Sequence, residues 1–541
     1  MGIMCCRKKI LLLSIGIAVG VLLVIIGGIM IYYGNQTVHN TINKEGVIEE
    51  GTLAYENWIQ TGSPVYRQFW LFNVKNPSDI MNSGARPILE QKGPYTYRVR
   101  YLPKSNITVN DNYTVSFLQP FSAIFERSMS AGPETDRLTA LNLAAAGAPS
   151  LVPPIFHNMV DRILKNVNAS LFQNRTVGEL LWGYEDPILK QMQSKDPITG
   201  IFYPYNGTED GYYNVFTGKD EISKVGIIDR WRSEKKLPFW NDQYCDMING
   251  TDGSSFPPFL HNVMKIYFFS SDICRSIFAE YEQKKSLKGI PVHRFVIPPK
   301  ALASYVENPD NRCYCKDKTI SQNCTYGGIL GISACKEKKP IFISLPHFLY
   351  ASDEIVNSIE GMTPNKEEHE TLLDVEPVTG FSLRIAKRIQ INLMFKPSKN
   401  IEILHNIKEP TYFPLIWLNE TVTVDDETAK RFKRSLIIPV RVLGIAQLSL
   451  LCLGSLMCIS FAIALCLTSR RNNFCRCTDP CSIHWQSEFQ IQSCDMIRNP
   501  SSPEALWEPF THAIDQSICK LTMKYLKYIS YKTVASFQST C

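Results

Sequence analysis

The chain has 541 residues, of which 45% are hydrophobic and 20% charged, and its net charge is +6 at neutral pH. A basic balance can indicate a nucleic-acid partner, but residues 34–438 hold 45 basic and 45 acidic residues, so the whole excess lies in the flanking segments. Membrane topology and attraction to anionic lipid explain such an excess better. We therefore expect no nucleic-acid partner, and the length leaves room for a large core.

Residues 10–33 form an apolar run of 24 residues that ends in Tyr32 and Tyr33, which suit a membrane interface. Arg7, Lys8 and Lys9 precede it. A cleaved signal peptide has a shorter apolar core and a small-residue cleavage site. The run therefore predicts an uncleaved transmembrane helix over residues 10–33, preceded by a cytosolic N-terminus over residues 1–9.

Small and sulfur-bearing residues in this segment suggest two further properties. Cys5 and Cys6 lie beside the basic residues at the bilayer surface, so we predict S-palmitoylation, with free thiols as the alternative. Gly16 and Gly20 are four residues apart, a spacing that lets membrane helices approach closely. This pair is compatible with a homo-oligomer, although glycines are common in membrane helices.

Short runs of β-branched and aromatic residues dominate residues 34–438 and are separated by Gly, Pro and Asn, a pattern typical of strands. Examples are Tyr66–Val74, Tyr95–Tyr101, Thr114–Leu118, Val292–Ile297, Ile341–Leu345 and Arg388–Phe395. In the last run Gln390 and Asn392 alternate with apolar residues, as in a half-exposed strand. We predict a mostly antiparallel sheet or barrel.

Helical patterns concentrate in one part of this region. Apolar residues recur at three- to four-residue spacing from Ile155 to Val167, after a Pro-Pro pair, and predict one helix. Thr176 and Glu179 form a capping box that begins another. A further helix is predicted at Ser271–Lys284. We expect a helical cluster inserted into a β scaffold, within one domain.

Cysteines and glycosylation sequons both place residues 34–438 outside the cytosol. An even number of cysteines in an oxidising compartment suggests three disulfides. They are Cys245, Cys274, Cys313, Cys315, Cys324 and Cys335. A zinc site among the last four is the alternative, but their spacing fits no common zinc module, and we expect no metal. The sequons begin at Asn35, Asn106, Asn112, Asn168, Asn174, Asn206, Asn249, Asn323 and Asn419.

A second apolar run, Val442–Leu467, has 26 residues without charge or proline. A helix of that length spans ~39 Å, more than the ~30 Å hydrocarbon core of a bilayer. A buried soluble helix is the alternative, but such helices rarely lack a polar face over this length. Arg470 and Arg471 follow the run. The positive-inside rule then places both termini in the cytosol, with an ectodomain at residues 34–438, a span at 439–467 and a tail at 468–541.

Motifs of common enzymes are absent from the sequence. Gly331-Ile332-Ser333-Ala334 ends in Cys335, where a nucleophile elbow needs glycine. Gly218-Lys219 lacks the earlier glycine of a phosphate-binding loop, and His369-Glu370 has Leu373 where a zinc protease needs histidine. The cluster Glu367–Glu370 carries side chains that can bind a metal, but we interpret it as the acidic, solvent-exposed start of a helix. We predict no enzyme and no cofactor.

Several motifs resemble the class B scavenger receptor family over about residues 40–467. They are Gly93–Arg98, Thr114–Phe117, Glu179–Tyr184, Cys245–Thr251, Phe268–Arg275 and Leu345–Phe348. Three further stretches are most similar to a member of that family that takes up long-chain fatty acids. These are Tyr66–Trp70, Val306–Asn311 and His347–Ser352.

The resemblance implies an α+β fold, in which an antiparallel β-barrel-like ectodomain carries an apical helical bundle and an internal lipid tunnel. It implies the pairs Cys245–Cys313, Cys274–Cys335 and Cys315–Cys324, and palmitoylation of Cys466. The implied partners are long-chain fatty acids, oxidised lipoproteins, phospholipids and thrombospondin, the last through a segment similar to Gly93–Pro120. The implied location is the plasma membrane, with the Golgi and lipid rafts as further sites.

The sequence departs from the family pattern at three places. Asn166 and Asn168 stand where the fatty-acid transporter has apical lysines, which leaves Lys165 as the candidate for meeting a lipid carboxylate. Leu465 replaces a tyrosine, and the tail is unusually long. We predict a cell-surface receptor that binds these ligands and promotes fatty acid uptake. The alternatives are a lysosomal member that binds a hydrolase and an adhesion receptor without lipid transfer.

Overall fold

The computed structural model describes residues 2–60, 62–100, 102–316 and 324–476. The chain divides into two compact units, residues 1–36 with 440–541 and residues 37–439. The predicted tail lies outside the described residues beyond Arg476, and the sequon at Asn323 also lies outside them.

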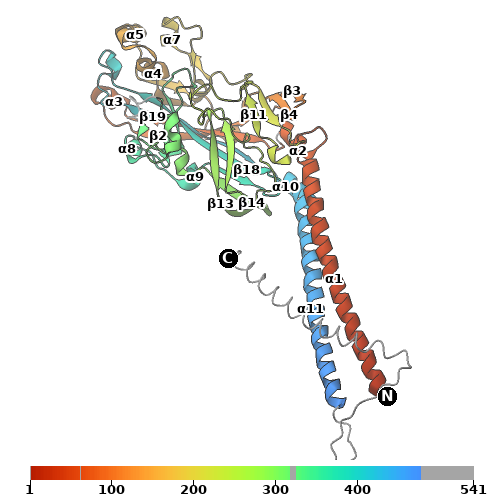
Figure 1. Ribbon diagram of the computed structural model, residues 1–541. Helices are drawn as coiled ribbons and strands as arrows, with labels where there is room; N and C mark the ends of the chain where they lie inside the picture. The colour runs from red at the N-terminus through yellow and green to blue at the C-terminus, as the bar shows by residue number, and fades with distance from the viewer. Residues whose placement is uncertain (1, 61, 101, 317–323, 477–541) are drawn as a thin grey trace, which may run out of the picture. The chain divides into compact units, whose positions relative to one another are not determined.

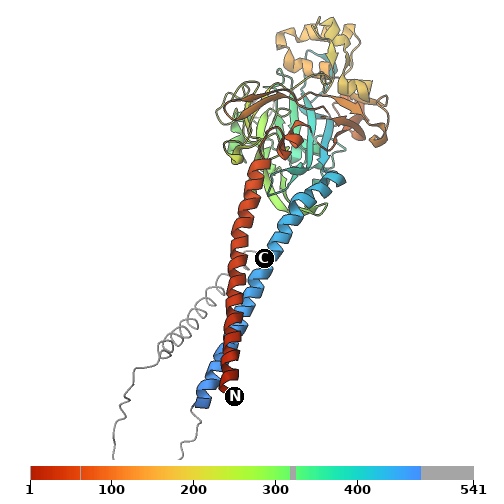
Figure 2. The same cartoon turned by 90° about the vertical axis from the view of Figure 1, so that its right-hand side faces the viewer.

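Two long helices, α1 (Gly2–Glu45) and α11 (Ile438–Arg476), contain the two apolar runs and are long and apolar enough to cross a membrane. In the first unit they lie side by side (Figures 1 and 2). A Cβ atom at Gly20 would lie 2.7 Å from Cys458 Sγ, and one at Gly16 would lie 2.7 Å from the Phe461 ring. The amide of Gln447 donates a hydrogen bond of 2.9 Å to the carbonyl oxygen of Met30. Gly16 and Gly20 thus allow close contact between two helices of the same chain.

The second unit is built on an 11-stranded sheet in which every strand pair is antiparallel. The order is β12-β13-β14-β17-β18-β19-β1-β2-β5, and β16 joins β15 to β18. The bounds are β1 Val65–Val74, β2 Leu89–Val99, β5 Ala123–Phe125, β12 Lys265–Ser270, β13 Arg275–Leu287, β14 Ile290–Val296, β15 Ile329–Gly331, β16 Ile341–Ser344, β17 Leu372–Val375, β18 Ser382–Phe395 and β19 Thr411–Thr423. The strand path is open at β12 and β5, so the described chain shows an antiparallel sheet and no closed barrel.

Three smaller sheets and several short helices complete this unit. One sheet has the order β11-β10-β4-β3, and β6 pairs with β7 and β8 with β9. The bounds are β3 Ser105–Asn110, β4 Thr114–Leu118, β6 Arg137–Leu141, β7 Phe172–Thr176, β8 Tyr184–Glu185, β9 Ile198–Thr199, β10 Tyr213–Phe216 and β11 Ile228–Trp231. The short helices are α2 Leu53–Ile59, α3 Pro77–Ser83, α8 Asp353–Asn357, α9 Lys366–His369 and α10 Asp426–Phe432.

The predicted helical cluster is confirmed. Helices α4 (Leu143–Leu151), α5 (His157–Asn166) and α7 (Pro187–Gln191) pack together at one end of the unit (Figure 1). Helix α6 (Val177–Trp182) begins with the predicted capping box, in which Thr176 Oγ1 accepts from Glu179 N–H and the Glu179 carboxylate accepts from Thr176 N–H.

The predicted helix at Ser271–Lys284 is wrong, because this segment forms the turn between β12 and β13 and most of β13. Side chains alternate between buried and half-buried from Arg275 to Glu280, with Ile277 and Ala279 in the core. That period of two belongs to a strand, and β12 and β14 satisfy the backbone of β13 on both sides.

The interpretation of Gln390 and Asn392 as the exposed side of a strand is also wrong, because both are fully buried. The amide of Gln390 donates to Asn392 Oδ1 at 2.8 Å, and Asn392 donates to Ser344 Oγ at 3.1 Å. Gln390 Oε1 accepts from the backbone N–H of His347 at 2.7 Å. A mutual hydrogen-bond network therefore takes the place of water on the second face of β18.

The six cysteines of the second unit form three disulfides, Cys245–Cys313, Cys274–Cys335 and Cys315–Cys324, which are the pairs that the resemblance implies. The alternative of a zinc site is wrong, because each of the four sulfurs that it needs is bonded to another sulfur.

Candidate functional site

A cavity of about 520 Å³ lies in the second unit beside the disulfide-linked segment. This volume falls in the usual range for ligand sites in proteins, ~300–1,000 Å³. Its apolar wall includes Leu302, Tyr326, Leu330, Phe342 and Met394. Phe342 and Met394 come from the paired strands β16 and β18, so the sheet itself forms part of this wall. An apolar wall of this kind suits a hydrocarbon chain.

One buried cation, Arg275, borders the cavity. Its guanidinium lies over the ring of Tyr314, 3.7 Å from the centroid. It donates to the main-chain carbonyls of Ala301 at 3.3 Å and Ser276 at 3.2 Å, and among the described residues it forms no ion pair with a carboxylate. Burial lowers the pKa of Arg275 below its ordinary value. A buried charge without a counter-ion is costly, so an anionic ligand group is favoured here.

Disulfides position both sides of this cavity. Arg275 is the first residue of β13 and follows Cys274, which is bonded to Cys335. Cys315 and Cys324 line the cavity and are bonded to each other. Disulfides therefore cross-link the backbone next to Arg275 and another part of the lining, which favours a preformed site.

A second group of charges lies across three neighbouring strands of the sheet. Arg67 on β1 and Lys387 on β18 are the direct cross-strand neighbours of Glu420 on β19. Arg67 and Glu420 are buried and form an ion pair, and Arg100 Nε lies 3.0 Å from Glu420 Oε1. Lys387 forms an ion pair with Asp272. Three cations thus face two carboxylates on this side of the sheet.

The carboxylate of Glu420 holds this group together. Burial alone would raise its pKa, but the guanidiniums of Arg100 and Arg67 outweigh burial and lower the pKa to about 2. Glu420 is therefore ionised over the physiological range, and the two arginines depend on it for their counter-charge. The sequence showed no sign of this arrangement, because its members are far apart in the chain.

The helical cluster contains Lys165, which the sequence singled out. Its ammonium lies 2.8 Å from a carboxylate oxygen of Asp161 and 2.8 Å from one of Glu402. Hydrogen bonds from Lys165 to Asp161 and Glu402 raise its pKa above the ordinary value. Two carboxylates thus already neutralise the amine. Asn166 and Asn168, which stand where the resemblance leads one to expect lysines, are exposed.

We expect Lys165→Ala to change the affinity for oleate by less than about threefold, because an exposed ion pair contributes only ~0–1 kcal/mol. The measurement is binding of labelled oleate to the full chain in detergent at low and high salt. A tenfold loss that disappears at high salt would show instead that Lys165 captures the carboxylate.

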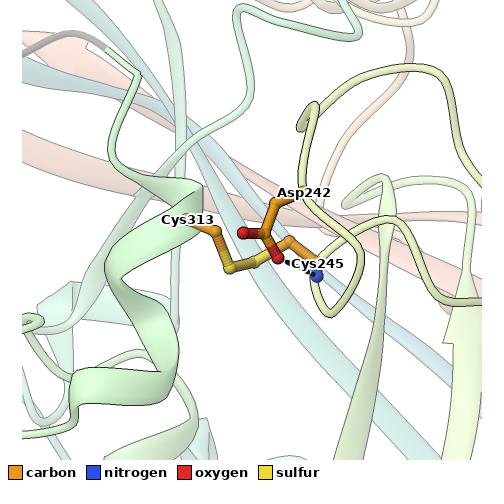
Figure 3. Close-up of side chains that lie close together, drawn as sticks. All are labelled: Asp242, Cys245 and Cys313. Atoms are coloured by element: carbon orange, nitrogen blue, oxygen red, sulfur yellow. Dashed lines mark hydrogen bonds between the residues drawn. A yellow bond between two sulfur atoms is a disulfide. The ribbon is translucent and has the colours of Figure 1, made fainter.

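Asp242, Cys245 and Cys313 bring potential metal ligands together, but they do not form a metal site (Figure 3). The two sulfurs are bonded to each other and offer no thiolate. The Asp242 carboxylate accepts the backbone N–H groups of Tyr244 at 2.8 Å and Cys245 at 3.2 Å. It caps a turn, which is the common role of an aspartate in such a loop.

The acidic cluster Glu367–Glu370 contains a buried residue that sequence reasoning took for part of an exposed helix start. His369 stacks on His347, with ring centroids 4.5 Å apart. Each Nδ1 accepts a backbone N–H, from Asn365 for His369 and from Thr363 for His347. Burial lowers the pKa of each histidine to about 4, so both are neutral at physiological pH.

The predicted modification sites occupy varied positions. Six sequon asparagines are exposed, namely Asn35, Asn106, Asn112, Asn168, Asn174 and Asn206. Asn249 and Asn419 are half-buried. Cys5 and Cys6 lie in α1, and Cys466 is half-buried in α11.

Known proteins resemble most of this chain. The CD36 family matches residues 18–465. Lysosome membrane protein 2 is 38% identical over 405 residues in both Rattus norvegicus and Homo sapiens, covering 74% of this chain and 83% of each relative. Scavenger receptor class B member 1 of Sus scrofa is 33% identical over 449 residues, covering 81% of this chain and 86% of the relative.

Proposed function

The chain belongs to the CD36 family, and from this premise we propose that it is a membrane receptor for lipids that carry an anionic group. Its ligands are long-chain fatty acids, phospholipids and oxidised lipoproteins. The observation that carries the proposal is the cavity bordered by Arg275, whose lining combines apolar side chains with a buried cation that has no carboxylate partner among the described residues. The family similarity adds thrombospondin, through Gly93–Pro120, as a further partner.

The mechanism needs no covalent step and no cofactor. The hydrocarbon chain leaves water for the apolar wall and gains ~0.8 kcal/mol for each buried CH₂ group. The anionic group orients the ligand by pairing with the Arg275 guanidinium. An internal tunnel then leads the lipid to the outer leaflet, and the concentration gradient drives the transfer. Two membrane helices, at residues 10–33 and 439–467, anchor the ectodomain with both chain ends in the cytosol.

The test compares oleate with oleyl alcohol, which has the same chain without the carboxylate. We expect Arg275→Gln to weaken oleate binding to the full chain in detergent by about 10- to 100-fold, since a buried hydrogen bond to a charged group contributes ~1.5–3 kcal/mol. Oleyl alcohol binding should change by less than about threefold, because it offers no charge.

Arg232→Gln is the matched control, because Arg232 also stacks on an aromatic ring, Trp231, but is exposed. Equal losses in the two variants would contradict the proposal. If Arg275→Gln does not fold, the comparison of the two ligands on the wild-type chain is still decisive. Equal affinity of the wild type for oleate and oleyl alcohol would overturn the role of Arg275.

A second candidate function is that of a lysosomal receptor for a hydrolase. The 38% identity to lysosome membrane protein 2 favours it. So does an exposed apolar patch on the helical cluster, formed by Leu151, Ile155, Phe156 and Met159. Surface biotinylation combined with lysosome purification separates the two candidates, because a plasma-membrane receptor is biotinylated on intact cells and a lysosomal one is recovered with the organelle.

A further inference from the structure

Seven basic residues lie on two segments that are at least 142 positions apart in the sequence but that the fold brings together. One segment is the end of β13 and the turn that follows, and the other is α10 with the helical turn Lys433–Ile437. We call these residues the β13–α10 basic patch: Lys284, Lys285, Lys288, Lys430, Arg431, Lys433 and Arg434.

Two direct contacts hold the segments together. Lys288 Nζ lies 2.7 Å from Asp426 Oδ1, and Lys433 Nζ donates to the carbonyl oxygen of Lys288 at 3.0 Å. Beneath them an apolar cluster that includes Ile290, Val292 and Ala429 packs the hairpin against α10. The basic patch is therefore a fixed surface and does not depend on the freedom of single side chains.

Most of these cations lack a carboxylate partner among the residues that the structure describes. Lys284, Lys285, Lys430, Arg431 and Arg434 form no ion pair in the part of the chain that the structure describes, and all five are exposed. Acidic residues of the same segments are engaged elsewhere. Glu282 pairs with Lys366, and Asp425 accepts hydrogen bonds from Thr428 and Ser63. Glu427 offsets only one of the free charges.

This surplus contrasts with the rest of the ectodomain. Exposed lysines on other elements commonly have carboxylate partners, as in the pairs Lys190–Glu185 and Lys219–Glu49. Residues 34–438 as a whole are electrically balanced. Single exposed lysines without an ion pair, such as Lys195 and Lys399, also occur elsewhere among the described residues, but five such cations lie together on these two adjoining segments. This local excess of positive charge indicates a negatively charged partner.

Part of this surface is close in sequence to the second apolar run. Arg434 precedes Val442, the first residue of the uncharged run, by eight positions, and Lys433–Ile437 continues directly into α11. Eight helical residues span ~12 Å, and long Lys and Arg side chains extend further toward head groups. Screening at physiological salt acts over ~8 Å, so these charges interact strongly with an anionic surface only where their side chains extend to within that distance of the head groups.

We propose that the β13–α10 basic patch binds anionic lipid head groups in the leaflet on the ectodomain side of the membrane. Such binding recruits negatively charged lipid to the place where α11 leaves the bilayer. This goes beyond the proposed function, because the bound lipid is part of the surrounding membrane and not the transported ligand.

The test uses the full chain in bilayer nanodiscs of phosphatidylcholine with phosphatidylserine. Electron paramagnetic resonance of spin-labelled lipids measures the preference of the protein for phosphatidylserine over phosphatidylcholine. We expect the triple variant Lys284→Gln, Lys285→Gln, Arg434→Gln to lower this preference at least about twofold, and high salt to lower it in the wild type. Cytosolic basic residues contribute equally to the lipid preference of the wild type and of the variant, so their contribution cancels in the comparison.

The matched control removes the same charge elsewhere, with Lys195→Gln, Lys399→Gln and Lys408→Gln, three exposed residues without ion pairs in the described chain. An unchanged preference in the patch variant, or an equal loss in the control, would overturn the proposal. If the triple variant unfolds, Lys284→Gln with Lys285→Gln leaves α10 intact and carries the same expectation. Patch-dependent binding to immobilised heparin without a lipid preference would assign the surface to a soluble polyanion and also overturn it.

Discussion

Replacing Glu420 with glutamine is expected to lower the free energy of unfolding by about 3–5 kcal/mol, the typical cost of removing one partner from a buried ion pair. The reason is that Arg67 and Arg100 both lose their counter-charge while Arg67 stays buried. The measurement is the chemical unfolding midpoint of the full chain in detergent at pH 7. Because the pKa of Glu420 is lowered from 4.5 to about 2, its contribution is complete above pH 4.5 and is lost as pH falls toward 2.

An exposed ion pair provides the control for this prediction. Glu185 pairs with Lys190, and both side chains are more than half exposed. Glu185→Gln should therefore change the unfolding free energy by less than about 1 kcal/mol. The double variant Arg67→Met, Glu420→Gln should recover part of the loss, because one of the unpaired cations is removed with its partner. Equal stability of Glu420→Gln and the wild type would show that water already neutralises the arginines.

Acid is expected to destabilise the second unit through the stacked pair His347 and His369. The ordinary pKa of histidine is 6.5, and burial lowers both to about 4 in the folded state. Between these values the unfolded chain binds protons that the folded chain does not, so stability falls as pH decreases from 6.5 to 4. At pH 5 each histidine accounts for a loss of about 2 kcal/mol relative to neutral pH.

The measurement compares unfolding midpoints at pH 7.4 and pH 5.0 in the wild type, in His369→Gln and in the control His405→Gln. His405 is exposed, so its replacement should leave the pH dependence unchanged. His369→Gln removes one of the two groups and should roughly halve the acid-induced loss, whatever its effect at neutral pH. A variant with the full wild-type pH dependence would assign acid sensitivity to other groups. The result bears on whether the protein can reside in an acidic organelle.

The sequence predicted those parts of the fold that depend on local patterns. The capping box at Thr176 and the strand Thr114–Leu118 were predicted within the observed bounds, because caps and short alternating runs are encoded by neighbouring residues. The segment Ser271–Lys284 was misjudged because its apolar residues fit both periods, and only pairing with β12 and β14 selects the strand. Gln390 and Asn392 were misjudged because their partners come from a distant strand.

The candidate site was less accessible to sequence reasoning. Arg275 and Arg67 both lay within motifs that supported the family resemblance. Nothing local showed that Arg275 lacks a counter-ion in the described part of the chain or that Arg67 pairs with Glu420. Lys165 was chosen by its place in the sequence, and its neutralisation by Glu402 requires a contact across 237 positions. Burial and charge balance are properties of the assembled fold, so a single sequence does not reveal them.

The order of the disulfide partners constrains how the chain is made. Cys245 and Cys274 are the first of the six ectodomain cysteines to be synthesised, yet their partners are Cys313 and Cys335. The two bonds interleave along the chain, so neither loop can close before the other has begun to emerge. At ~5–20 residues per second, Cys274 is synthesised seconds before Cys313. Any early bond between the first two cysteines is a mispairing, and only thiol–disulfide exchange can convert it to the observed pairs.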